Sequence, residues 1–64
     1  MTLLEEFNNR FHETPAEPSK VILFEILDDI TGRRGFRQEW DAIDDDIKED
    51  LLNENLEIIT KNLP

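Results

Sequence analysis

His12, Ser19 and a dense set of carboxylates are the side chains of this 64-residue chain that could take part in catalysis. A Ser-His-acid triad needs its nucleophile, base and orienting carboxylate within hydrogen-bond reach of one another. The chain has one histidine, one serine, no cysteine and no tyrosine, and a proline-containing stretch separates His12 from Ser19. Acid–base groups also need a pocket that shifts their pKa values, which a domain of this size rarely provides. We therefore expect no enzyme, no catalytic residue and a solvent-facing His12.

Asp44, Asp45 and Asp46 belong to a run, residues 41–52, that has the length of an EF-hand calcium loop. Such a loop needs a glycine at its sixth position and a bidentate glutamate at its twelfth. This sequence has Asp46 and Leu52 there, and the Glu-x-x-His pattern of di-iron bundles is absent as well. We predict neither a metal nor another cofactor. The acids suit a helix start, where they cap free N–H groups and complement the helix dipole.

Three arginines lie close together directly before an acidic segment: Arg33 and Arg34 stand between Gly32 and Gly35, and Arg37 follows two residues after Gly35. A guanidinium group pairs with carboxylates or phosphates as a directional fork. The cluster could bind phosphate, could pair with acids of this chain or of a second copy, or could contact the acids of another protein.

Phe36 and Trp40 stand beside these arginines, on one helical stripe with Ile43. The stripe indicates a core position for Trp40, whereas tryptophan and arginine are also the residues that anchor protein interfaces. Trp40 can be both a core residue and an interface residue if this helix lies at the interface with a partner. We predict a partner-binding surface made of Arg33, Arg34, Phe36, Arg37, Trp40, Asp44, Asp45 and Asp46.

The net charge of −9 bears on the choice of partner. Residues 39–64 hold nine of the sixteen acids and only two bases. This field repels nucleic acid and anionic membranes and attracts basic protein surfaces, although acidity can also serve solubility alone. We expect no direct nucleic-acid binding, no membrane contact and a cytoplasmic location, since the chain has no cysteine and no apolar run near ~20 residues.

The apolar periodicity predicts an all-α fold in a single domain, residues 1–64, built as a small three- to four-helix bundle with short links. Thr2 and Glu5 form a capping box for the first helix, and Gly32 is expected to end the second in a left-handed conformation. A single helix from residue 36 to the C-terminus is an alternative, because Ile47 continues the stripe of Trp40. The predicted helices cover residues 2–12, 17–31, 36–43 and 45–62.

Two of these helices have wider apolar faces than one neighbour can cover. Helix 17–31 has an apolar arc of about 200°. Helix 45–62 has one apolar line through Leu51 and another through Leu52. Both faces together exceed what so few short helices can bury, so we predict a helix-mediated homodimer or another protein as partner.

The chain is interpreted as a small acidic protein–protein interaction module that acts as a regulator, inhibitor or adaptor of a larger protein. The alternative is a nucleic-acid mimic, whose acidic C-terminal half occupies a basic DNA- or RNA-binding protein. The profile is tiny, acidic, cysteine-free and helical, and it resembles that of small inhibitory or accessory proteins encoded by phages and mobile elements. This resemblance is one of composition, with no motif behind it, and it implies no site residue.

Overall fold

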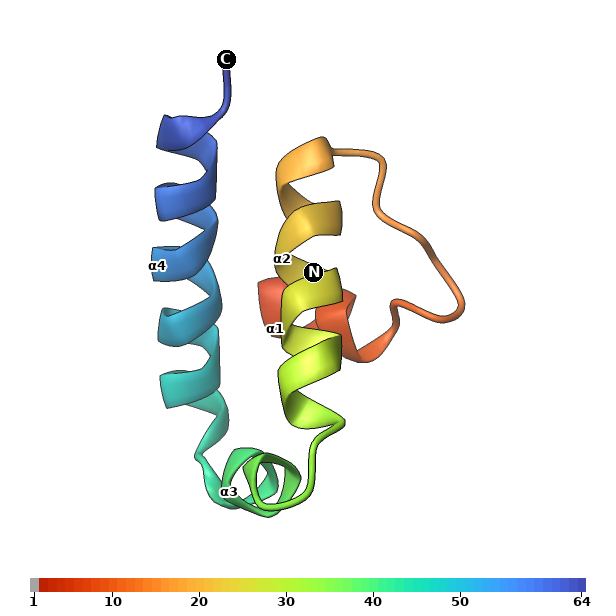
Figure 1. Cartoon of the computed structure of the whole chain (residues 1–64), viewed down its shortest axis with the longest axis vertical. Coiled ribbons are helices and arrows are strands. Elements are labelled where there is room, and N and C mark those ends of the chain that lie inside the picture. Colours follow the sequence, from red (N-terminus) through yellow and green to blue (C-terminus); the bar gives the residue numbers. More distant parts are fainter. Residues whose placement is uncertain (1) are drawn as a thin grey trace.

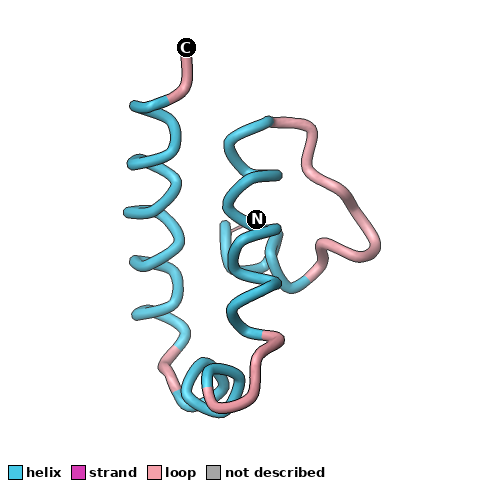
Figure 2. Tube along the Cα trace, in the orientation of Figure 1, coloured by secondary structure: helices cyan, strands magenta, loops and turns pink. Residues whose placement is uncertain are grey.

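The computed structural model describes residues 2–64, which form four helices and no strand (Figures 1 and 2). Helices α2 and α4 lie side by side and run in opposite directions, α3 crosses the end where they are joined, and α1 lies behind them (Figure 1). The prediction of an all-α fold is confirmed. No helix within residues 2–64 is long and apolar enough to cross a membrane. The bounds are α1, Leu3–Asn8; α2, Pro18–Thr31; α3, Phe36–Ala42; and α4, Asp45–Asn62.

Proline and its neighbours set the limits of α2 and α4. Pro18 occupies the first turn of α2, where its missing N–H costs nothing, and Glu17 before it is extended. Leu63 is likewise extended, which ends α4 directly before Pro64. Between α3 and α4, Ile43 and Asp44 both adopt extended conformations, so the two helices are separate.

The left-handed residue of the turn between α2 and α3 is Gly35, with φ of 94°, and the prediction for Gly32 is wrong. Gly32 stays right-handed, with φ of −80°. A Cβ on Gly32 would lie 3.0 Å from the carbonyl oxygen of Asp28, a tight contact that favours glycine at this position. The chain reverses instead at Gly35, whose N–H donates to Oε1 of Gln38 (2.8 Å) in the first turn of α3.

Helix α1 is shorter than predicted, because it ends at Asn8 and the chain continues to His12 in turns. The carbonyl of Phe7 accepts a hydrogen bond from the side chain of Arg10 (2.8 Å), which also stacks over the ring of Phe7 at 4.1 Å. The chain leaves the helix before Phe11, which is 77% exposed although it lies within the predicted helix 2–12. The expected capping box of Thr2 and Glu5 is present.

The core lies where α1 meets α2 and α4. Phe7 is its centre, since its ring packs edge-on against Phe24 (5.5 Å between centroids) and against Trp40 (5.9 Å). Helix α3 contributes no fully buried side chain and closes the core only through Trp40. The buried residues are Leu3, Leu4, Phe7, Leu23, Phe24, Leu27 and Leu52.

The carboxylate of Glu49 on α4 ties α1 to the rest of the molecule. It accepts hydrogen bonds from the backbone N–H groups of Leu4 (2.8 Å) and Leu3 (3.3 Å), which have no partner within their own helix. The N–H of Leu4, with the side chain of Asn53 and the N–H of Leu3, holds the pKa of Glu49 below its ordinary value. A residue far along the chain thus caps the first helix.

Candidate functional site

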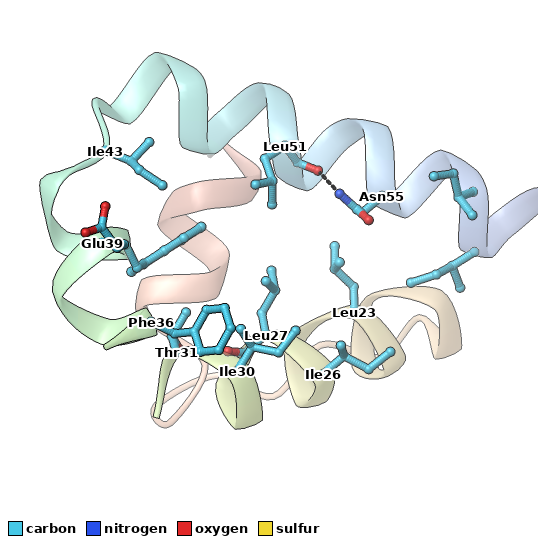
Figure 3. A pocket seen from close by; sticks show the side chains of 13 residues that line it. Leu23, Ile26, Leu27, Ile30, Thr31, Phe36, Glu39, Ile43, Leu51 and Asn55 are labelled. Atoms are coloured by element: carbon cyan, nitrogen blue, oxygen red, sulfur yellow. Dashed lines mark hydrogen bonds between the residues drawn. The ribbon is translucent and has the colours of Figure 1, made fainter. Parts of the chain in front are cut away.

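An apolar groove runs between α2 and α4 on the side that faces away from α1 (Figure 3). Its volume is about 400 Å³, and α3 closes one end. Both walls present aliphatic side chains to the space between the helices, as Figure 3 shows for Leu23 on α2 and Leu51 on α4. The lining residues whose side chains are exposed are Ile26 and Ile30 on α2, Phe36 and Glu39 on α3, and Asn55 and Ile58 on α4.

The rim of this groove is apolar and exposed to solvent. Ile26 on one wall and Ile58 on the other are 50% and 51% exposed, and Phe36 at the closed end is 59% exposed. Ile26 and Ile58 belong to the wide apolar faces of α2 and α4, of which α1 covers only one side. Four large exposed apolar side chains, Ile26, Ile30, Phe36 and Ile58, therefore surround this groove, whereas Phe11, Ile47 and Leu63 are exposed elsewhere.

Two of the polar side chains that line the groove donate to backbone carbonyls of their own helix. The hydroxyl of Thr31 donates to the carbonyl of Leu27, and the amide nitrogen of Asn55 donates to the carbonyl of Leu51, both at 2.7 Å. The carboxylate of Glu39 forms no ion pair within residues 2–64. The apolar lining and the unpaired carboxylate of Glu39 therefore favour a ligand that combines apolar surface with positive charge.

The structure does not gather the three arginines of the predicted surface into one cluster. Arg33 pairs with Asp29 one turn earlier on α2 (3.2 Å), and both side chains are 64% exposed, so the pair contributes little to stability. Arg34 lies with Phe36 at one shallow hollow, whereas Arg37 lines another that faces α1. Neither Arg34 nor Arg37 forms an ion pair within the described part of the chain.

Phe36 and Trp40 have different surroundings, although both line the groove. Trp40 is half-buried, packs edge-on against Phe7 and has the ammonium group of Lys48 5.2 Å from its ring centroid. Phe36 is exposed at the closed end. Trp40 thus forms the floor between core and groove, and Phe36 is the aromatic side chain that a partner can reach.

Asp44, Asp45 and Asp46 lie at the start of α4, beyond the opposite end of α3 from Arg34. All three are exposed and none pairs with an arginine in residues 2–64. Asp44 is the N-cap residue, but its side chain forms no capping hydrogen bond, contrary to expectation. The acids still complement the positive end of the helix dipole.

The potential catalytic and metal-binding groups are dispersed. His12 is exposed in the link after α1, and Ser19 lies in the first turn of α2. Within residues 2–64, no three histidine, cysteine or carboxylate side chains converge in a way that could hold a metal ion.

Ile26, Ile30 and Ile58 were not among the predicted site residues, and they dominate the exposed part of the groove. The signal that could have found them is the excess width of the two apolar faces. No protein-family model, no curated protein and no solved structure matches the chain. The groove and the charge around it are therefore the features of the molecule that bear on its function.

Proposed function

We propose that this chain is a small protein–protein interaction module, a regulator, inhibitor or adaptor of a larger protein, and that the α2–α4 groove is its contact surface. The observation that carries the proposal is the collection of Ile26, Ile30, Phe36 and Ile58 around one open apolar groove. Protein interfaces typically have such an apolar centre surrounded by polar groups. The arginine turn and the acidic start of α4 then belong to the rim, where contacts are weaker.

The homodimer predicted from the wide apolar faces would cover the same groove, with a second copy as the partner. The nucleic-acid mimic would use another surface, the acids of α4. It predicts binding that needs Asp44, Asp45 and Asp46, does not need Ile58, and weakens steeply as salt rises. The mimic therefore differs from the other two functions in the residues that it requires, whereas the homodimer differs from the interaction module in the molecule that it binds.

Site-specific photo-crosslinking in the source cell tests the proposal. A photoreactive phenylalanine analogue replaces Ile58 in one variant and Ile47 in the other. The two positions share one helix and are 51% and 53% exposed, but only Ile58 lines the groove. We expect a crosslink to a larger protein from position 58 and none of the same mass from position 47.

Equal crosslinking from both positions, or none from position 58, would refute the groove as the contact surface. The triple change Asp44→Asn, Asp45→Asn and Asp46→Asn separates the alternative. If that change abolishes the crosslink, and the captured protein binds nucleic acid, the mimic explains the result. A crosslink between two copies of the chain would instead assign the groove to the homodimer.

A further inference from the structure

The polar atoms and dimensions of the groove also indicate what kind of partner it takes. Resting on the function proposed above, we propose that the occupant is one face of an amphipathic helix that carries basic residues on its flanks. The helix would lie between α2 and α4, on the side opposite α1, and would complete a layer of helices on that face.

The shape of the groove suits a helix of two to three turns. Its α2 wall extends from Leu23 to Ile30, which corresponds to about 10 Å of helix, and α4 supplies a wall of similar length from Leu51 to Ile59. Helices that bind in grooves insert apolar side chains at i, i+3 or i+4, and i+7, which is the spacing such walls accommodate. The chain itself provides a precedent, because α1 places Leu3, Leu4 and Phe7 into the opposite side of the same region.

The carboxylates near the groove indicate which residues flank the apolar face of the proposed helix. Glu39 lines the α3 end of the groove. Glu54 on α4 is outside the lining, but it stands one helical turn from the lining residues Leu51 and Ile58, within reach of the flank of a bound helix. Neither carboxylate forms an ion pair within residues 2–64, whereas Asp29 on the α2 side is already paired with Arg33. Lysine or arginine beside the apolar positions of the partner would meet these two free carboxylates.

The same charges argue against a second copy as the occupant. Each copy has a net charge of −9, so a dimer would bring two strongly acidic surfaces together. An interface through this groove would also place Glu39 and Glu54 near the acids of the other copy. Arg34, beside Phe36 at the closed end, is the only base among the residues of its hollow and cannot neutralise both carboxylates.

Selection of random 16-residue peptides displayed on phage against the full chain tests this inference. We expect the selected peptides to share apolar residues at helical spacing and a net positive charge. Synthetic copies should gain helical circular dichroism on binding and should change the emission of Trp40, the sole tryptophan, which lines the groove. Ile58→Asp should weaken their affinity about tenfold or more, and Ile47→Asp should leave it unchanged.

A matched pair of charge variants tests the flanks. Glu39→Gln with Glu54→Gln should weaken binding about 2- to 30-fold at low salt, the range for two exposed ion pairs. Glu13→Gln with Glu25→Gln removes as much charge from exposed positions that do not line the groove, and it should have little effect.

Several results would overturn the proposed occupant. They are selected peptides that bind in an extended form, peptides that are acidic, or no peptide that requires Ile58. A chain that sediments as a dimer, and becomes a monomer with Ile58→Asp only, would show a second copy in the groove. The peptide outcomes leave the crosslink from position 58 to a larger protein untouched, so they reject the basic helix without rejecting the interaction module. The dimer outcome would also assign the groove to the homodimer.

Discussion

Replacement of Glu49 by glutamine isolates the charge that caps α1. The side chain keeps its size and one acceptor oxygen, but it loses the carboxylate that accepts from the N–H groups of Leu3 and Leu4. A hydrogen bond to a charged group contributes about 1.5–3 kcal/mol and a neutral one about 0.5–1.5 kcal/mol. We therefore expect Glu49→Gln to lower the free energy of unfolding by about 1 kcal/mol, out of about 3–10 kcal/mol for a chain of this length.

Urea unfolding, followed by Trp40 fluorescence and by circular dichroism, measures this loss. With an m-value of about 1 kcal/mol/M, the midpoint should fall by about 1 M at pH 7. Glu54→Gln is the control, because it removes the same charge from the same helix without breaking a hydrogen bond within residues 2–64. Equal midpoints for wild type and Glu49→Gln at pH 7 would refute the capping argument.

The pH dependence gives a second readout of the same contact. The pKa of Glu49 in the folded chain lies below its ordinary value of 4.5, because backbone N–H groups favour the ionised form. The ionised side chain therefore stabilises the fold above about pH 4.5, and this contribution is lost as the pH falls through the lowered pKa. The difference between wild type and Glu49→Gln should accordingly shrink toward pH 3. A difference that stays constant would contradict the assignment.

Three further changes test the packing. Leu52→Ala removes the most completely buried side chain and should cost about 2–5 kcal/mol in urea unfolding, whereas Ile47→Ala, at a half-exposed position, should cost less than about 1 kcal/mol. Gly35→Ala places a side chain at φ of 94° and should cost about 1–3 kcal/mol by the same assay, with a cost near zero contradicting the turn geometry. Arg10→Met keeps part of the cover over Phe7 but removes the hydrogen bonds to the Phe7 carbonyl and to Asp28. It should lower the urea midpoint and increase amide hydrogen exchange in α1. Unchanged exchange would show that the guanidinium group does not stabilise α1.

Local chemistry accounts for the features that were predicted correctly. The all-helical fold follows from apolar spacing, and the capping box of Thr2 and Glu5 depends on residues within one turn. The beginning of α2 at Pro18 and the end of α4 before Pro64 follow from the fixed φ of proline and its effect on the preceding residue. Information of this kind is contained in a few consecutive residues.

Features that depend on distant contacts were missed. The end of α1 at Asn8 depends on the side chain of Arg10, which is positioned by Asp28 on another helix. The cap by Glu49 joins residues at opposite ends of the sequence, so no short pattern reveals it. Gly32 stays right-handed and continues the helical hydrogen bonding, since its N–H donates to the carbonyl of Asp28 (3.0 Å), and the positive φ falls on Gly35.

The groove depends on both local sequence and distant contacts, so it could be predicted only in part. The width of the apolar faces of α2 and α4 was evident from the sequence, and it correctly indicated more apolar surface than the core uses. Which side remains open depends on where α1 packs, and α1 covers Leu52 while leaving Ile58 exposed. The sequence places Arg33, Arg34 and Arg37 close together. In the structure, however, Arg34 and Arg37 line different hollows.

The most direct test of the central claim is a methyl spectrum of the isoleucine-labelled chain, recorded with and without the protein that crosslinks at position 58. Ile26, Ile30 and Ile58 border the groove, whereas Ile22 and Ile47 lie outside its lining. We predict that the partner shifts or broadens the first three methyl signals and leaves those of Ile22 and Ile47 in place. Changes confined to Ile22 and Ile47, or uniform changes across all isoleucines, would contradict the assignment of the groove as the interaction surface.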